Sequence, residues 1–224
     1  MPVPISVIVP TLNAGRSLPG CLAALFEGLD AGLITELIVT DAGSDDETCA
    51  VADEWGANIV TGAPSRGGQL QRGCAAARGE WLLILHADTQ LAPGWSDAVR
   101  VHLGQGKAGY FHLSFDRGGR VVACWANLRS RLFGLPYGDQ GLLVPRRLYN
   151  RVGGYPDIPL MEDVALARAL RGQLKPLDAV AVTSADKYRR QGWLRRGTRN
   201  LWTLARFFAG TDPETLAAAY RRAR

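Results

Sequence analysis

The stretch Trp81-Leu82-Leu83-Ile84-Leu85-His86-Ala87-Asp88 is the most apolar strand-like run of the chain, and a carboxylate follows it directly. A short, continuous apolar run of this kind is typical of a strand that is buried on both faces of a sheet. Three shorter apolar runs precede it, and a helical pattern follows each of them. The expected strands cover residues 5–10, 36–41 and 57–61, and the expected helices cover residues 17–26, 45–55 and 68–78.

Short strands that alternate with longer helices predict β-α-β units around a parallel sheet. After residue 104 the pattern loosens, with strand-like segments at 109–115 and 141–145 and helical ones at 121–132 and 161–170. We therefore expect an α/β domain over residues 1–186, with a mainly parallel central sheet flanked by helices. Residues 187–224 are expected to form a basic helical C-terminal extension packed on this domain.

Composition limits the class of protein. The chain has 224 residues, of which 47% are apolar, so it can build a full core, and a disordered or collagen-like chain is excluded. No apolar run approaches the roughly 20 residues that span a bilayer. The start, Met1-Pro2-Val3-Pro4, lacks the basic region of a secretory signal, which predicts a cytoplasmic protein. The four cysteines form no C-x-x-C pair, which argues against a zinc ribbon.

The positive charge is concentrated in the tail. Residues 187–224 hold ten Lys or Arg and two acids, whereas residues 1–186 hold 16 basic and 19 acidic residues. Such a tail suits anionic lipid, nucleic acid or phosphate groups, and composition does not choose among them.

On a helix over residues 193–208, Arg195, Arg196, Arg199 and Arg206 fall within one arc. The apolar residues cluster on the opposite side: Trp193, Leu194, Leu201, Leu204, Ala205 and Phe208. We favour a terminal helix that packs its apolar face on the domain. The alternative is a helix that lies on an anionic membrane, which would place the protein peripherally at the inner face of that membrane and give it a lipid or a lipid-linked glycan as a substrate.

Polar residues follow the expected strands, where ligands bind in open parallel sheets. Asp41 precedes a turn and is expected to be spare for contact with a nucleobase imide or a ribose hydroxyl. Asp45 and Asp46 are assigned instead to capping the next helix. Asp88, with His86 beside it, can hold a divalent cation on a diphosphate, either Mg²⁺ or Mn²⁺. A structural role is the alternative for His86.

Two adjacent acids, Glu162 and Asp163, stand at the start of an expected helix, after the turn-rich segment 153–159. Compensation of the helix dipole explains one of the pair. A carboxylate that a stiff loop holds in place can also serve as a general base for a hydroxyl nucleophile.

Together these motifs resemble those of the family 2 glycosyltransferases, which have the GT-A (nucleotide-diphospho-sugar transferase) fold. The resemblance covers residues 4–175. It consists of the first strand and turn at 7–13, the acidic turn at 41–48, His86-Ala87-Asp88 in place of the metal-binding D-x-D, and the E-D pair Glu162-Asp163. Residues 85–89, 137–140 and 161–164 also resemble a small bacterial subgroup of these enzymes.

The resemblance implies an inverting transfer of a hexose-type sugar from a nucleoside diphosphate sugar to an acceptor hydroxyl, on a small molecule, a glycan or a lipid-linked glycan. Asp163 would be the general base, and Asp88 and His86 would hold the divalent metal. The implied donor contacts are Pro10, Thr11, Asn13, Asp41, Arg66 and Ala87. On the acceptor side the resemblance implies Asp139, Gln140 and Glu162.

The sequence also departs from the family pattern. His86 replaces the first acid of D-x-D, Ala14-Gly15 replaces the usual acid after Asn13, and the Q-x-x-R-W signature of processive synthases is absent. A sugar-nucleotide nucleotidyltransferase is one alternative, although it needs a richer glycine loop after the first strand. A basic nucleic-acid-binding module is another, but it leaves the strand-end acids unexplained, so we do not expect nucleic acid as a partner. A degenerate transferase that binds nucleotide without turnover is the third.

Overall fold

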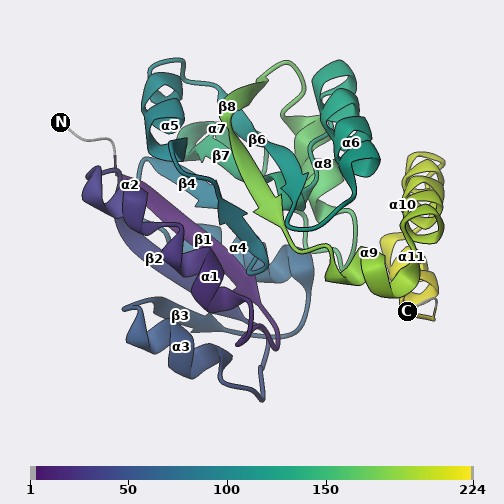
Figure 1. Cartoon of the computed structure of the whole chain (residues 1–224), viewed down its shortest axis with the longest axis horizontal. Coiled ribbons are helices and arrows are strands. Elements are labelled where there is room, and N and C mark those ends of the chain that lie inside the picture. The colour runs from purple at the N-terminus through teal and green to yellow at the C-terminus, as the bar shows by residue number, and fades with distance from the viewer. Residues whose placement is uncertain (1–3, 223–224) are drawn as a thin grey trace.

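A mixed sheet of eight strands forms the centre of the molecule over residues 4–222, which the computed structural model describes (Figure 1). The order of the strands across the sheet is β3-β2-β1-β4-β7-β6-β8-β5. The strands are β1 (Ile5–Thr11), β2 (Ile34–Asp41), β3 (Asn58–Thr61), β4 (Trp81–Ile84), β5 (Thr89–Leu91), β6 (Ala108–Phe115), β7 (Leu142–Pro145) and β8 (Leu174–Thr183).

Four of the seven neighbouring strand pairs are parallel, which agrees with the predicted α/β fold and its mainly parallel sheet. The continuous parallel part is β3-β2-β1-β4, in which Ile8 pairs with Ile38 on one side and with Ile84 on the other. Strand β7 runs antiparallel to both β4 and β6, and β5 runs antiparallel to β8. The three predicted N-terminal strands and the strand at Trp81 are therefore neighbours in space.

Helices cover both faces of the sheet (Figure 1). The predicted helix over residues 17–26 is divided into two short helices, α1 and α2. The helices are α1 (Leu18–Ala23), α2 (Phe26–Asp30), α3 (Thr48–Glu54), α4 (Arg66–Ala76), α5 (Trp95–Leu103), α6 (Arg120–Phe133), the 3-10 helix η1 (Gly138–Gln140), α7 (Arg146–Arg151), α8 (Glu162–Ala169), α9 (Asp186–Gln191), α10 (Trp193–Phe208) and α11 (Pro213–Arg222).

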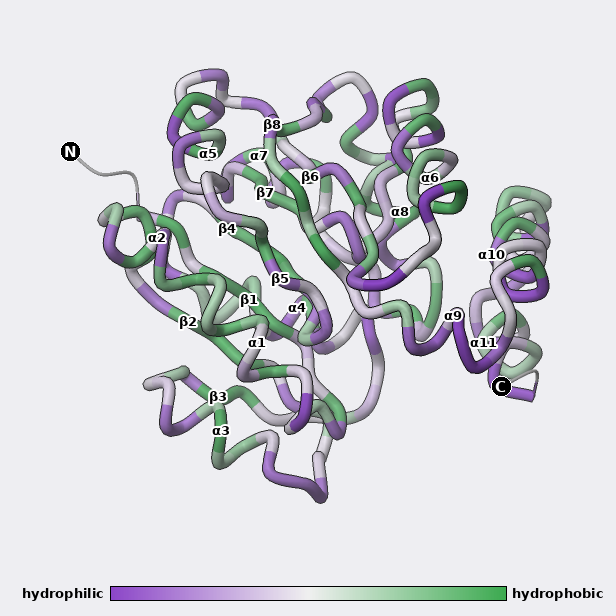
Figure 2. Tube along the Cα trace, in the orientation of Figure 1, coloured by the Kyte–Doolittle hydropathy of each residue, from purple (hydrophilic) through white to green (hydrophobic). Residues whose placement is uncertain are grey.

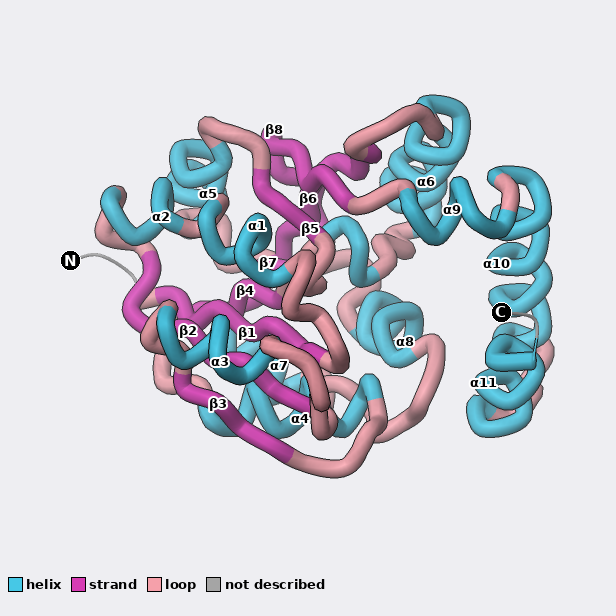
Figure 3. Tube along the Cα trace, turned by 60° about the horizontal axis from the view of Figure 1, so that its bottom comes forward, coloured by secondary structure: helices cyan, strands magenta, loops and turns pink. Residues whose placement is uncertain are grey.

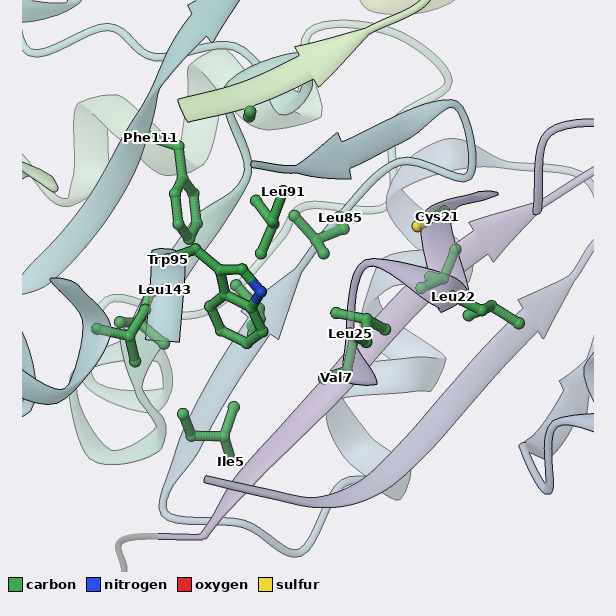
Figure 4. Close-up of a cluster of buried hydrophobic side chains, with 14 of the residues drawn as sticks. Ile5, Val7, Cys21, Leu22, Leu25, Leu85, Leu91, Trp95, Phe111 and Leu143 are labelled. Carbon is green, nitrogen blue, oxygen red and sulfur yellow. The ribbon is translucent and has the colours of Figure 1, made fainter. Parts of the chain in front are cut away.

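Alternate residues of β1 enter two separate cores, because successive side chains of a strand point to opposite faces. Ile5 and Val7 pack with α1 and with Trp95 of α5, which lies in the middle of this core beside Phe111 (Figure 4). Ile8 faces the other side and packs with Leu70 of α4. Burial on both faces explains why these strands appear in the sequence as continuous apolar runs (Figure 2).

A third, smaller core attaches the C-terminal helices to the sheet. Phe115 at the end of β6 contacts Tyr188 of α9 and Trp193 of α10, at 5.2 and 5.1 Å between ring centroids. Tyr188 and Trp193 stack on each other at 4.9 Å, and Ala123 and Ala126 of α6 belong to the same cluster. The extension begins with α9 at Asp186 and is held mainly by this aromatic contact.

The predicted packing of α10 by its apolar face holds at Trp193, the first residue of the helix, and is wrong for most of the rest. Leu194 is 85% exposed and Trp202 is 66% exposed, and the buried residue of the helix is Thr203. Arg196 and Asn200 instead face a pocket in the domain. The partners of this polar side belong to the neighbouring helix α9: Arg196 donates to Gln191 Oε1 over 2.9 Å and lies over the Tyr188 ring.

None of the helices within residues 4–222 combines the length and the apolar character that a membrane span requires. The cysteines are free thiols. Cys21 and Cys74 are buried, Cys49 is half-buried, and Cys124 on α6 is exposed.

Candidate active site

The carboxyl ends of β1, β2 and β4 meet at one edge of the sheet, because the three strands are parallel neighbours. Hydrogen bonds connect the turn after β1 to the turn after β2. The Asn13 amide donates to Ser44 Oγ over 2.8 Å, and the Asp45 amide donates to Asn13 Oδ1 over 3.0 Å. Asn13 has a φ of 51°, in the left-handed region that asparagine tolerates better than most residues. The two turns therefore fix each other at the strand ends.

Asp46 supports the start of α3, as predicted. Its side chain accepts hydrogen bonds from the Thr48 amide over 3.0 Å and from the Gly15 amide over 2.9 Å. The predicted capping role thus belongs to Asp46, and the same carboxylate also fixes the turn after β1.

Asp41 is 1% exposed and lies between the two turns. Its Oδ1 accepts from the hydroxyls of Thr11 and Ser44, and its Oδ2 accepts from the amides of Gly43 and Ser44 over 2.8 and 2.7 Å. Burial disfavours the charged form, but these hydrogen bonds outweigh it and lower the pKa of Asp41. The prediction that Asp41 is spare for ligand contact is wrong, because four hydrogen bonds occupy its lone-pair positions.

A groove runs along this edge of the sheet, and we call it the strand-end groove. It brings together every predicted donor contact except Asp41. Its lining includes Pro10, Thr11, Leu12, Asn13, Ser65, Arg66, His86, Ala87, Asp88, Lys187, Arg190 and Arg221.

A second hollow adjoins the groove, with Arg66, His86, Asp88 and Lys187 in both linings. We call it the carboxylate pocket; it holds about 870 Å³ of space, its open mouth included. Four acids from three separate segments meet there. The lining includes Arg66, His86, Asp88, Tyr137, Gly138, Asp139, Glu162, Asp163, Lys187, Tyr188, Arg196, Asn200 and Tyr220.

Arg66, the first residue of α4, bridges the two hollows. Its Nε lies 3.0 Å from Glu162 Oε1, and its NH2 group lies 3.0 Å from His86 Nε2. A guanidinium can only donate, so His86 Nε2 accepts and the ring carries its proton on Nδ1. Burial and the Arg66 charge lower the pKa of His86 to about 4, so the ring is neutral at pH 7. The Nε2 lone pair that a metal would need is thus used by Arg66.

Glu162 is 1% exposed, and its charge is compensated by Arg66. Burial raises the pKa of Glu162, and the neighbouring Asp163 carboxylate adds to this, while Arg66 opposes it. Glu162 therefore lies in the wall of the pocket, as predicted, but its carboxylate is paired within the protein.

Asp163 stands in the first turn of α8, where acids are favoured by the helix dipole. The Gly138 amide donates to Asp163 Oδ2 over 2.8 Å, which orients the carboxylate in the pocket. Glycine is favoured at position 138 because a Cβ there would lie 2.3 Å from His86 Nε2. The absence of a side chain therefore lets η1 lie close to His86, while its backbone amide contacts Asp163.

Asp88 lies where the groove and the pocket join. Lys187 Nζ of α9 is 2.7 Å from Asp88 Oδ2. Burial opposes ionisation of this carboxyl group, but Lys187 and His86 outweigh it and lower the pKa of Asp88. Asp88, which was predicted to hold a metal, is thus paired with the ammonium group of Lys187.

Asp139 lines the pocket, whereas Gln140 does not. Burial raises the pKa of Asp139 to about 6, and its Oδ1 is buried with no hydrogen bond among residues 4–222. Gln140 is completely buried, donates to the Phe111 carbonyl over 3.1 Å and accepts from Ser130 Oγ. The prediction of an acceptor contact for Gln140 is therefore wrong, because both ends of its amide bind inside the domain.

The C-terminal extension supplies pocket residues that the sequence interpretation missed. They are Lys187, Tyr188, Arg196, Asn200 and Tyr220. The basic composition of the tail signalled a phosphate-binding potential, but it did not say which side of α10 faces the domain. Their presence joins the extension to the site.

The arrangement as a whole, a sheet with a groove at its parallel strand ends beside a pocket of carboxylates, is that of a GT-A fold. The chain belongs to the glycosyl transferase family 2, whose sequence model matches residues 6–153. One relative, a PGL/p-HBAD biosynthesis glycosyltransferase of Mycobacterium bovis, is 36% identical over 93 residues, which are 38% of this chain and 36% of the relative.

Solved structures show the same fold. TarS 1–349 of S. aureus in complex with UDP-GlcNAc matches with a TM-score of 0.67 and 16% identity, over 80% of this chain and 58% of the other. The mannosyltransferase PcManGT of Pyrobaculum calidifontis, in complex with GDP-Man and Mn²⁺, has a TM-score of 0.64 and 21% identity, over 86% and 60%. The chain spans 25% to 36% of the length of the first curated relatives that it matches.

Proposed function

We propose that this protein transfers a sugar from a nucleoside diphosphate sugar to an acceptor hydroxyl, with inversion at the anomeric carbon. One observation carries the proposal. Asp163 lies in a pocket that adjoins the strand-end groove, and two cationic side chains, Arg66 and Lys187, line both hollows. The complexes of the two similar structures with UDP-GlcNAc and GDP-Man support a nucleotide sugar as the donor.

The groove suits the nucleotide. Pro10, Thr11, Asn13 and Ala87 line it and offer backbone and amide groups to a nucleoside. Arg66 and Lys187 stand at its junction with the pocket, where a diphosphate needs positive charge. The sugar would then extend into the carboxylate pocket, where Asp139 is a lining acid that can accept hydrogen bonds from sugar or acceptor hydroxyls.

The donor set fits a divalent cation in a limited way. Among the described residues, no group of three or more His, Cys, Asp or Glu side chains is arranged to hold a metal ion. Mg²⁺ in nucleotide enzymes is commonly bound by one or two carboxylates together with phosphate oxygens, and Asp88 can supply one such carboxylate. His86 can join only after its Nε2 releases Arg66. A cation held there would neutralise charge on the diphosphate.

Asp163 performs the proton transfer in this proposal. As the acceptor oxygen bonds to the anomeric carbon, the hydroxyl proton passes to Asp163 and the bond to the nucleoside diphosphate breaks. The Gly138 amide holds the carboxylate in place for this step. Arg66 and Lys187 stabilise the charge that develops on the departing diphosphate. A single displacement of this kind inverts the anomeric centre.

Replacing Asp163 with Asn tests the base. We expect D163N to lose at least a hundredfold in kcat, which is the low end of what a general base contributes, while the Kd for nucleotide changes less than threefold. The matched control is D97N, because Asp97 is also an acid in the first turn of a helix but is exposed on α5. D97N should keep the wild-type kcat. Wild-type turnover in D163N would refute the assignment of Asp163 as the general base.

A thermal-shift panel of UDP-, GDP- and dTDP-sugars, each with and without Mn²⁺, identifies the donor. A ligand that binds only the folded state raises the melting temperature. Products then separate the alternatives: pyrophosphate release from a nucleoside triphosphate marks a nucleotidyltransferase, and stabilisation without donor hydrolysis or transfer marks a chain that binds nucleotide without turnover.

A further inference from the structure

Large apolar side chains that are exposed to solvent are concentrated at one end of the molecule. Of the thirteen within residues 4–222, nine lie on α6 and α10, which stand at the same end in two views (Figures 1 and 3). Figure 2 shows the same helices carrying apolar residues at the edge of the fold. We call this set the apolar end face; it consists of Val121, Trp125, Leu128, Leu132, Phe133, Leu194, Leu201, Trp202 and Phe208.

The spacing of these residues places most of them on one side of each helix. On α6 the separations from Val121 are four, seven and eleven residues, and Phe133, twelve residues on, lies at the edge of that side; on α10 the separations from Leu194 are seven, eight and fourteen. The opposite sides are occupied. Ala123 and Ala126 of α6 pack in the aromatic cluster, and the inward side of α10 contributes to the carboxylate pocket. Neither helix can therefore rotate to bury its apolar side.

Charge indicates what covers this face. The sequences of α6 and α10 contain no acidic residue. Arg120, Arg131 and Arg195 of these helices are exposed beside the apolar end face. An apolar surface with tryptophans and a border of arginines complements a bilayer that carries anionic headgroups.

We propose that the apolar end face docks on the surface of an anionic phospholipid bilayer. Trp125 and Trp202 would lie at the level of the headgroups, where an indole ring can bury its apolar body and keep its N–H in contact with water. Because Arg196 and Asn200 line the carboxylate pocket from the inner side of α10, docking brings that pocket close to the membrane surface. The inference does not depend on the proposed transfer reaction.

Co-sedimentation with vesicles tests the proposal. The full chain is mixed with phosphatidylcholine vesicles that contain or lack 30 mol% phosphatidylglycerol (about a third anionic lipid, ample for electrostatic attraction). We expect binding to the anionic vesicles, at least tenfold weaker binding to the neutral ones, and at least tenfold weaker binding of the L194E/W202E variant to the anionic vesicles. These two side chains are exposed, so the variant is expected to fold, and a cooperative thermal unfolding transition close to the wild-type melting temperature verifies this.

The matched control is V101E, because Val101 is 75% exposed on α5 and lies outside the apolar end face. Equal losses for V101E and L194E/W202E would overturn the proposal, as would equal binding to both kinds of vesicle or to neither. Sedimentation velocity identifies the competing occupant: a wild-type dimer that L194E/W202E converts to a monomer, without vesicle binding, would assign the face to a second copy of the chain.

Discussion

Helices α4 and α10 both border the carboxylate pocket, yet they are built in opposite ways. Helix α4 buries a continuous set of residues against the sheet and presents Arg66 from its first position. Helix α10 buries Thr203, directs polar side chains to the pocket and leaves its apolar side in solvent. One helix is held by the core, and the other is held by the aromatic cluster at its start and by polar contacts.

This contrast separates two kinds of stability within one site. The backbone of α4 is held as firmly as the sheet, because a displacement of this helix would expose the residues that it buries. The extension has few buried apolar contacts, and segments of that kind open at a lower free energy than the core does. The half of the site formed by the strand ends and α4 is thus fixed by folding, whereas the wall formed by α9 to α11 depends on local contacts.

The largest expected effect comes from removing the charge that α4 supplies. R66A leaves Glu162 buried without a counter-ion, and we expect a loss of about 2–3 kcal/mol of unfolding free energy at pH 8. Because burial already raises the pKa of Glu162, the carboxyl becomes neutral as the pH falls below it, and the deficit should shrink toward pH 5. Urea unfolding at the two pH values measures this.

The double variant R66A/E162Q is the control for this prediction. A neutral amide carries no uncompensated charge, so the second substitution should recover most of the stability at pH 8. A deficit that is the same at both pH values and is not relieved by E162Q would contradict the role of Arg66 as the counter-ion.

A matched pair of glycines tests the contrast between the helices directly. A Cβ at Gly73 of α4 would lie 2.5 Å from Ile8 Cγ2 and 2.8 Å from Thr40 Cγ2, whereas one at Gly197 of α10 meets nothing within 4 Å. We expect G73A to destabilise by about 1–2 kcal/mol, because overpacking exceeds the gain in helix propensity. G197A should stabilise by up to about 1 kcal/mol. Opposite shifts in thermal melting are the expected result, and shifts of the same sign would remove the distinction.

The last prediction concerns ligand binding and the cation that the extension contributes. Lys187 pairs with Asp88 where the groove and pocket join, so K187A should weaken nucleotide binding about tenfold in the absence of metal, or about 1.4 kcal/mol. Mn²⁺ should restore much of the loss, since Asp88 is then free of its ammonium partner. Titration calorimetry measures both values, with K175A on β8, an exposed lysine outside both hollows, as the control.

The sequence predicted the parallel half of the sheet well, because strands buried on both faces leave continuous apolar runs. It missed β8, the longest strand, which contains Lys175, Pro176 and Asp178. A proline inside a run argues against a strand, but the register between β6 and β8 shifts between Tyr110 and His112, opposite Pro176, and accommodates it. Such a local irregularity has no signature in the sequence.

Within the site, the motifs that mark a strand end or a helix start did indicate residues that lie together. His86, Asp88, Glu162 and Asp163 line one pocket, and their roles stay predictions. The sequence interpretation was wrong for Asp41 and Gln140, since a motif gives the position of a side chain but not the hydrogen bonds that satisfy it. It predicted the C-terminal extension but missed the residues that the extension adds to the pocket, because the pattern of an amphipathic helix does not show which of its two sides has partners.

The difference in exposure among the free thiols allows a fluorescent label to be attached at one chosen position of the molecule. Burial raises the pKa of Cys21 and of Cys74 to about 12, so neither forms a reactive thiolate near neutral pH. Cys124 is exposed on the outer side of α6. A maleimide dye whose emission depends on solvent polarity would attach there in the natural sequence. Its spectrum would then show directly when that side of the helix leaves water.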